Sequence, residues 1–212
     1  MWELLPAASG HRWQVLIEET YAAVTEAVRD LSEEELGRPT RTEWTVAELL
    51  WHQCLDAIRA LAAAATVVDD EPDVDAVTYW AEYTPDQGDG GAAHAAYVRR
   101  ATTAFESRRG VVDFWLATGP ATARAAAAAD PQARIATQGH VLRVPEFVST
   151  LVVEATVHLL DAYGEPPAAA LAETRRVLEA INGAPLDPAW DDTEAVLRGT
   201  GRLPGPPVAL LG

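Results

Sequence analysis

The sequence predicts an all-α protein. Apolar residues recur at spacings of three and four through most of the chain, as amphipathic helices require, whereas the alternation typical of strands is nearly absent. The 212 residues, of which 49% are hydrophobic, suffice for one domain or for one domain with a small appendage. Intrinsic disorder of the whole chain is therefore a poor interpretation.

Two long helices are expected in the first third of the chain. The first should run from about His11 to Leu31. Its apolar residues, spaced by one, three or four, are Leu16, Ile17, Tyr21, Val24 and Val28. After a loop with Gly37 and Pro39, the second helix should begin at Thr45 and end near Ala65. Thr45 and Glu48 form the capping-box pattern, which satisfies two free amides at a helix start.

An acidic segment, Thr66 to Gly91, follows the second helix. Loops of this length inside a compact domain are usually functional lids or disordered segments, but aromatic residues such as Trp80 and Tyr83 favour ordered packing of part of it. These aromatics either cover a site or only pack. A third helix is expected from about Ala93 to Ala117, and Gly110 can bend or break it.

The remaining elements are a fourth long helix and a helical tail. An alanine-rich segment near 125–129 and a short extended piece at 140–144 precede the fourth helix, which should run from Pro145 to Tyr163. Pro145 stands where its missing amide does no harm, and Gly164 ends the helix. Two shorter helices, 168–182 and 192–199, should complete the chain.

The charge excludes some classes of partner. The chain has 32 acidic residues against 16 basic ones, all of them arginine, so the formal net charge is -16. This charge repels phosphate backbones and anionic lipids, which disfavours nucleic-acid and membrane-surface roles and favours small molecules or proteins as partners. The single cysteine, the absence of a signal-peptide pattern at the start and the absence of a long apolar run favour a cytoplasmic protein.

The fourth helix carries the pattern with the clearest chemical meaning. It is apolar almost all round and therefore buried, yet Glu154 and His158 lie one turn apart on it. A buried unpaired carboxylate is unfavourable, and a divalent metal ion would satisfy both side chains. The alternative is a structural hydrogen bond between them, or a pairing with an arginine from a neighbouring helix. Glu-x-x-x-His alone is a weak signal in so acidic a chain.

A third ligand must come from another helix. His52 is the best candidate, because the second helix also combines a histidine with strong apolar character; the alternative is that its face, shared with Asp56 and Arg59, is solvated. Cys54 lies about 200° further around that helix, so it cannot share a mononuclear site with His52 and is interpreted as a small core residue. His11 and His94 are interpreted as ordinary surface histidines.

Two motifs carry a resemblance to a known family. Residues 44–52, WTVAELLWH, resemble the W-(S/T)-x-x-(D/E)-L-x-x-H opening of the second helix in the DinB-like superfamily. Residues 154–161, EATVHLLD, resemble the E-x-x-x-H-x-x-D pattern of its mycothiol-dependent maleylpyruvate isomerase branch. The likeness covers roughly residues 10–165. It implies a DinB-like four-helix bundle over 1–165, followed by a short helical extension over 166–212.

The resemblance also implies a metal site and a chemistry. His52, Glu154 and His158 match the family's three ligands of a zinc-like divalent ion, and three protein ligands leave a position open for catalysis. The implied cofactor is mycothiol, whose thiol would add to a small electrophile, with isomerisation or thiol transfer as the outcome. Absence of lysine fits the GC-rich actinobacterial setting in which mycothiol occurs.

Several residues are weaker candidates. Asp161 matches an acidic position in the family motif, and Asp161 or Asp56 is the candidate acid or base. Arg134, His140 and Arg143 precede the fourth helix and could contact the cofactor, although surface charges are the favoured interpretation. The family's isomerase has a sizeable second domain that contributes a substrate-binding arginine. Only about 47 residues follow the bundle here, which disfavours maleylpyruvate isomerisation itself.

Two other classes of function remain open at the level of sequence. One is a non-catalytic metal-binding regulatory or sensor protein with a closed site, in which Asp56 or Asp161 is a fourth ligand. The other is a metal-dependent hydrolase, in which one of these aspartates is the base for a metal-bound water. In the preferred reading the partners are a small electrophile and a low-molecular-weight thiol, and the protein is a monomer or homodimer.

Overall fold

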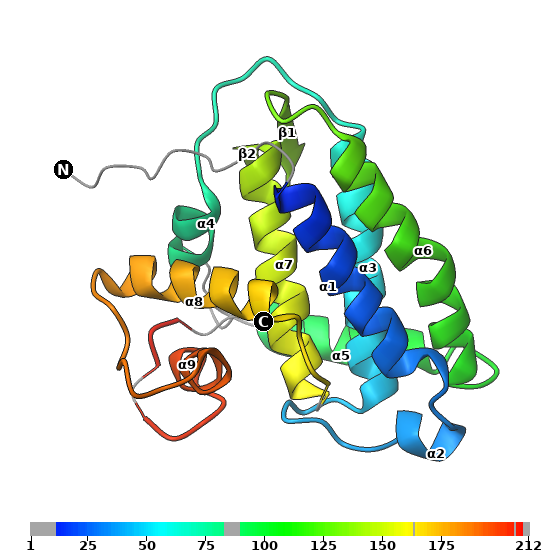
Figure 1. The fold of residues 1–212 in the computed structure, drawn as a ribbon. Helices are drawn as coiled ribbons and strands as arrows, with labels where there is room; N and C mark the ends of the chain where they lie inside the picture. Colours follow the sequence, from blue (N-terminus) through cyan, green and yellow to red (C-terminus); the bar gives the residue numbers. More distant parts are fainter. Residues whose placement is uncertain (1–11, 83–89, 163, 206, 210–212) are drawn as a thin grey trace.

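The computed structural model describes residues 12–82, 90–162, 164–205 and 207–209. Within these ranges it contains nine helices and one two-stranded sheet, which confirms the all-α prediction (Figure 1). No helix in the described part of the chain has the length and apolar character needed to cross a membrane.

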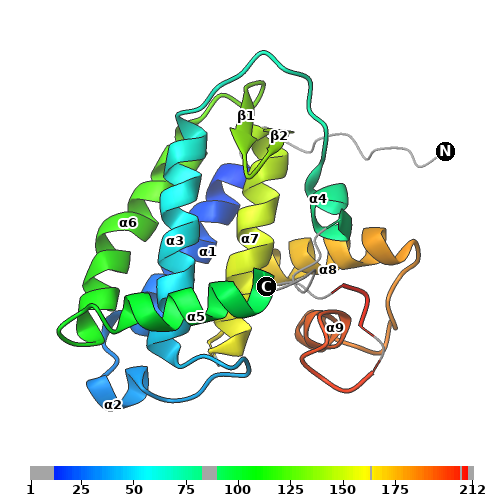
Figure 2. The same ribbon diagram turned by 180° about the vertical axis from the view of Figure 1, so that it is seen from behind.

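Four long helices lie side by side and enclose the main core (Figures 1 and 2). They are α1 (Arg12–Arg29), α3 (Val46–Ala64), α6 (Arg109–Ala128) and α7 (Val144–Asp161). α6 packs against both α1 and α3, and α7 packs mainly against α1. Ile17, Cys54, Trp115 and Val152 are fully buried between them, so Cys54 is the core residue that its position predicts.

Two of the described helices begin at a capping box. α3 begins after Thr45, whose side chain accepts from the amide of Glu48 at 3.4 Å, while the Thr45 amide donates to Glu48 Oε2 at 2.8 Å. The same reciprocal arrangement between Ser32 and Glu35 starts α2 (Glu33–Leu36), a one-turn helix in the segment predicted to be a loop. The capping pattern of Ser32 and Glu35 is present in the sequence, but a helix of four residues is too short to show the apolar periodicity by which a helix is predicted.

The predicted third helix is two helices. α5 (Gly90–Thr102) crosses α3 and α7 at a steep angle, whereas α6 runs along the bundle (Figure 2). The prediction of one helix over 93–117 is therefore wrong in its bounds, and the alanine-rich segment forms the end of α6. A side chain at Gly110 would meet the Phe105 ring at 2.8 Å, so glycine lets the turn between the two helices close tightly.

The described part of the segment between α3 and α5 includes one short helix. It contains α4 (Ala76–Glu82), whose first turn is capped by Asp75 Oδ1, which accepts from the amides of Val77 and Thr78. Before α7, β1 (Arg134–Thr137) pairs antiparallel with β2 (His140–Arg143). β2 confirms the predicted extended piece, and its partner β1 was not predicted. Both turn residues, Gln138 and Gly139, have positive φ, as a tight two-residue hairpin requires.

The helical tail has the predicted bounds. α8 (Ala168–Asn182) lies across α7 and α4, and α9 (Asp192–Gly199) packs on α8 (Figure 1). A second apolar cluster forms there, with Val153 and Val157 of α7 against Leu178 and Val196. α7 thus contributes to both clusters, and the division of the chain after residue 165 stays a prediction.

Candidate metal centre

α3 presents His52 and Asp56 on one face, one turn apart. The capping box sets where α3 begins, and the packing of α3 on α6 sets which face of α3 is turned toward α7. His52 is 8% exposed, and the ring of Trp44 packs against its imidazole with the ring centroids 5.1 Å apart. The alternative interpretation, that this face of the helix is solvated, is therefore wrong at His52, which is buried.

α7 presents Glu154 and His158 toward the same point. Almost every residue of α7 from Phe147 onward is buried, so the helix is sequestered as its composition predicts. His158 is 2% exposed. The helix thus holds a carboxylate and an imidazole in an apolar environment. Glu154 is 102 positions from His52 in the sequence, so only the fold brings the two together.

The three side chains converge on one carboxylate oxygen. Nε2 of His52 lies 3.0 Å from Glu154 Oε1, and Nε2 of His158 lies 3.1 Å from the same oxygen. One ligand atom from each residue falls within 4.8 Å of the other two. Two imidazole nitrogens and a carboxylate oxygen at this spacing are a donor set suited to a divalent ion of the zinc type.

Two unpaired oxygens support that fit. Glu154 Oε2 and Asp56 Oδ2 are buried and accept no hydrogen bond from any residue that the structure describes. Asp56 Oδ2 also lies 3.3 Å from His52 Nε2, close to the three converging atoms. Buried anionic oxygens without donors are costly, and a bound cation would satisfy them. The residues present therefore fit a divalent ion.

The far nitrogen of each histidine is also held. His158 Nδ1 lies 3.1 Å from Asp161 Oδ2, and His52 Nδ1 lies 3.1 Å from His94 Nε2. The guanidinium of Arg202 donates to both oxygens of Asp161, at 3.1 and 3.0 Å. Asp161 is fully buried behind His158 and thus faces away from the converging atoms.

Sequence reasoning missed two members of this outer layer. His94, interpreted as a surface histidine, is half-buried on α5 and contacts His52, so that interpretation is wrong. Its only sequence signal is that it is one of five histidines. Arg202 comes from the segment after α9, and nothing local in the sequence pairs it with Asp161. The other predicted surface histidine, His11, lies outside the described residues.

Burial and charge at the site shift the pKa values of several groups, among them Glu154, His158 and Asp56. Burial raises the pKa of Glu154, but His158 and His52 lower it by more, so the carboxyl stays ionised well below its usual range. Burial lowers the pKa of His158, but Glu154 and Asp161 outweigh it and raise the pKa to about 9. Burial raises the pKa of Asp56, and the charge of Glu154 adds to this although His52 opposes it.

A cavity of about 250 Å³ opens over these residues. Its wall includes Tyr79 and Trp80 of α4, His94 of α5 and Gln138 of the hairpin turn, together with Arg59 of α3. Gln138 Nε2 donates to the Tyr79 hydroxyl at 2.9 Å, which links the hairpin to α4. Trp80 thus lines the site, and Tyr83 lies outside the described residues.

Arg134, His140 and Arg143 are not brought to the site. The Arg134 guanidinium lies 2.9 Å from a carboxylate oxygen of Glu71, and His140 Nδ1 lies 3.3 Å from Asp73 Oδ2. These pairs fasten the acidic segment to the hairpin. Arg143 is exposed, and none of the three lines the cavity over the ligands. Their contacts favour the surface-charge interpretation.

Cys54 is buried, and burial raises its pKa to about 12, so it is a poor nucleophile.

Comparisons with known proteins give one family and one fold. The family model described as mycothiol maleylpyruvate isomerase N-terminal domain matches residues 17–163. A solved structure described as a crystal structure of the mycothiol-dependent maleylpyruvate isomerase is similar, with a TM-score of 0.61 and 16% sequence identity, over 90% of this chain and 88% of that chain. No curated protein matches the sequence. At this identity the likeness of the two structures shows the fold alone.

The extent of the structural match corrects one expectation. Residues 1–163 are fewer than 90% of the 212 residues, so the match must include part of the segment after α7. The sequence analysis expected this chain to differ from the family's isomerase in the segment after the bundle. The match shows that the two folds are similar over at least part of that segment.

Proposed function

Because the chain belongs to the mycothiol maleylpyruvate isomerase N-terminal domain family, we propose that it is a metal-dependent enzyme that uses mycothiol. Its reaction would add this thiol to a small electrophile, with isomerisation or net thiol transfer as the outcome. The observation that carries the proposal is the convergence of His52, Glu154 and His158 beside two buried oxygens that accept no hydrogen bond from the described residues.

The chain's own residues divide into ligands and supports. His52, Glu154 and His158 would hold a divalent ion such as Zn²⁺, which when bound lowers the pKa of a thiol and so supplies a thiolate at neutral pH. Asp161 and His94 would orient the two imidazoles through their Nδ1 atoms. Asp161 is therefore proposed as a positioning residue, because Arg202 and His158 occupy both of its oxygens.

Asp56 is proposed as the acceptor of the thiol proton. Its Oδ2, which accepts no hydrogen bond from the described residues, lies 3.3 Å from His52 Nε2, beside the converging ligand atoms, and its raised pKa makes the carboxylate a stronger base than an exposed aspartate. Arg59, which donates to Asp56 Oδ1 at 3.0 Å, holds the carboxylate in place. The cavity of about 250 Å³ above them suits a small substrate better than a macromolecule.

The first test is the metal content of the purified protein. Wild type should carry one divalent ion per chain, and His52→Ala and His158→Ala should each lose it. His140→Ala, which removes a histidine on the hairpin, is the matched control and should keep the ion. A wild-type protein without stoichiometric metal, or ligand variants that retain it, would show the site assignment to be wrong.

The second test separates the thiol enzyme from its rivals. In the Co²⁺-substituted protein, mycothiol should bind saturably and produce an absorption change that indicates sulfur ligation. Because Asp56 Oδ2 is so close to His52 Nε2, a closed site with Asp56 as fourth ligand is the competing arrangement. Two results together would favour that closed site. Wild type would show no sulfur band when mycothiol is added, and Asp56→Asn would have an altered Co²⁺ spectrum before any thiol is added. A hydrolase would show neither sulfur ligation nor thiol dependence.

A further inference from the structure

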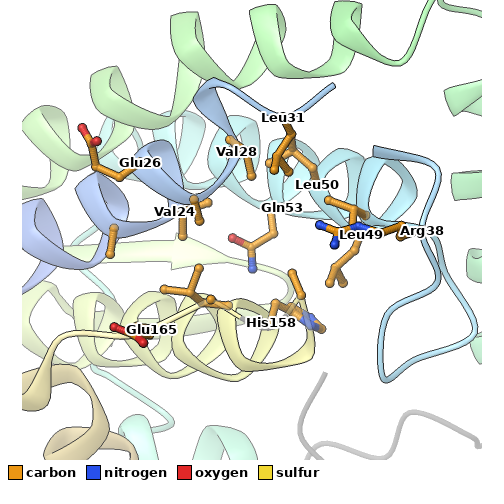
Figure 3. A pocket seen from close by; sticks show the side chains of 16 residues that line it. Val24, Glu26, Val28, Leu31, Arg38, Leu49, Leu50, Gln53, His158 and Glu165 are labelled. Atoms are coloured by element: carbon orange, nitrogen blue, oxygen red, sulfur yellow. The ribbon is translucent and has the colours of Figure 1, made fainter. Parts of the chain in front are cut away.

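A second cavity, of about 740 Å³, lies between α1, α3 and α7. It shares no lining residue with the cavity over the metal ligands among the residues that the structure describes. Its walls are mainly aliphatic and include Val24, Val28, Leu31, Leu49 and Leu50 (Figure 3). Its volume falls in the range of small-molecule sites, which bury apolar ligands and orient them with a few polar groups.

One polar side chain is aimed into this apolar space. Figure 3 shows Gln53 extending from α3 toward the middle of the cavity, between α1 and α7. The residue is 6% exposed, and its Nε2 has no hydrogen-bond partner in the described part of the chain. Buried polar groups in native proteins nearly always have a partner, so an amide donor left open here indicates an acceptor that the described residues do not supply.

The other polar groups narrow the chemistry of that acceptor. His158 lines the cavity, but Glu154 and Asp161 occupy its two ring nitrogens, so it offers no open donor. At the rim, Glu26 and Glu165 are exposed acids and Arg38 is an exposed base. Two acids against one base, in a chain of net charge -16, disfavour an anionic ligand.

We propose that this cavity binds a neutral, mainly hydrocarbon small molecule that carries one carbonyl group. The hydrocarbon part lies against the aliphatic walls, and the carbonyl oxygen accepts a hydrogen bond from Gln53 Nε2. This cavity is distinct from the one over the metal ligands, although His158 forms part of its wall, and the proposed binding requires neither the metal ion nor the thiol. Direct binding therefore tests it, whatever the outcome of the metal experiments.

The probe is octanamide, a neutral eight-carbon amide, compared with octanoate, which has the same chain and a negative charge. Calorimetry on the full chain should give one octanamide site, with affinity at least fivefold higher than for octanoate. Gln53→Leu should weaken octanamide binding roughly fivefold, the effect of one neutral hydrogen bond, and should bring the two probes closer together. Gln132→Leu, at an exposed glutamine, is the matched control and should bind as wild type does.

A filling variant tests the location. Ala27 lines the cavity, so Ala27→Trp should abolish binding of octanamide, while Ala172→Trp, at an exposed alanine of α8, should not. If Ala27→Trp fails to fold, the side-chain NH₂ resonances of Gln53 in wild type give the same information, because octanamide should shift them. Absence of binding, equal affinity for octanoate, no effect of Gln53→Leu, or shifts confined to the cavity over the metal ligands would each overturn the proposal.

Discussion

Asp161 and His94 each contact the far nitrogen of a proposed metal ligand. The Asp161 carboxylate only accepts, so it keeps a proton on Nδ1 of His158, and both contacts leave the Nε2 atoms directed at Glu154. The family motif identified Asp161 from sequence, but its role could not be assigned from spacing. Only the packing of α7 against the chain near Arg202 shows that this carboxylate faces away from the cavity.

Asp161→Asn should weaken Zn²⁺ binding 10- to 100-fold, because an amide orients and polarises the His158 imidazole less well than a carboxylate does. Chelator competition measures the affinity, and the Co²⁺ spectrum reports any change in ligand geometry. Asp113→Asn, on an exposed part of α6, is the control and should leave both readouts unchanged. Unchanged affinity in Asp161→Asn would contradict the positioning role.

Zn²⁺ affinity should depend on pH through His158. Its pKa is raised to about 9, so the ring holds a proton at neutral pH in the metal-free protein, and only the neutral ring binds a metal ion. Affinity should therefore rise about tenfold per pH unit below pH 9 and level off above it. Chelator competition at several pH values, together with proton release on metal addition, checks this. Affinity that does not change between pH 7 and 9 would contradict it.

Helix ends marked by a capping side chain, a proline or a glycine could be placed from sequence, whereas the boundary between α5 and α6 could not. α3 begins at the residue that its capping box predicts, and α8 and α9 have their predicted bounds. The sequence predicted one helix here, with Gly110 as a point where it can bend or break. Both α5 and α6 have helical periodicity, and Gly110 alone does not show whether one helix bends or two separate helices form. The packing of α5 across the bundle, at a steep angle to α6, is what separates the two helices (Figure 2).

Thr45→Ala should lower the free energy of unfolding by about 1 kcal/mol, because it removes the side-chain acceptor at the start of the helix that carries His52. Urea denaturation measures the change. Thr45→Ser should retain most of the stability, since serine also caps. Thr193→Ala, within α9, should have a smaller effect. Equal losses in Thr45→Ala and Thr45→Ser would argue against the cap.

The tail after residue 165 is joined to the site end of α7. The Arg202 guanidinium holds Asp161, and the Arg41 amide donates to the Asp161 carbonyl oxygen at 3.0 Å, so three distant segments meet there. The tail therefore contributes to the surroundings of His158. The predicted cytoplasmic location and the monomeric or homodimeric state stay predictions.

Arg202→Leu should destabilise the whole molecule by about 3 kcal/mol, because it leaves the fully buried Asp161 carboxylate without the guanidinium that donates to both of its oxygens. The double variant with Asp161→Asn should recover part of that loss. Arg176→Leu, which breaks an ion pair with Glu173 at a half-exposed arginine, should cost less than about 1 kcal/mol. Chemical denaturation distinguishes these outcomes, and similar losses in Arg202→Leu and Arg176→Leu would contradict the argument.

The sequence by itself determined the helical class, the caps, most helix bounds and the three candidate ligands, because periodicity, capping and motif spacing are properties of short segments. Tertiary structure alone decided which distant groups meet: Glu154 with His52, His94 behind His52, Arg202 on Asp161, and Gln53 in an apolar cavity. These contacts depend on how helices far apart in the chain pack and cross, and no local pattern encodes that. Arg134, His140 and Arg143 show the converse, since proximity in sequence to α7 did not bring them to its ligands.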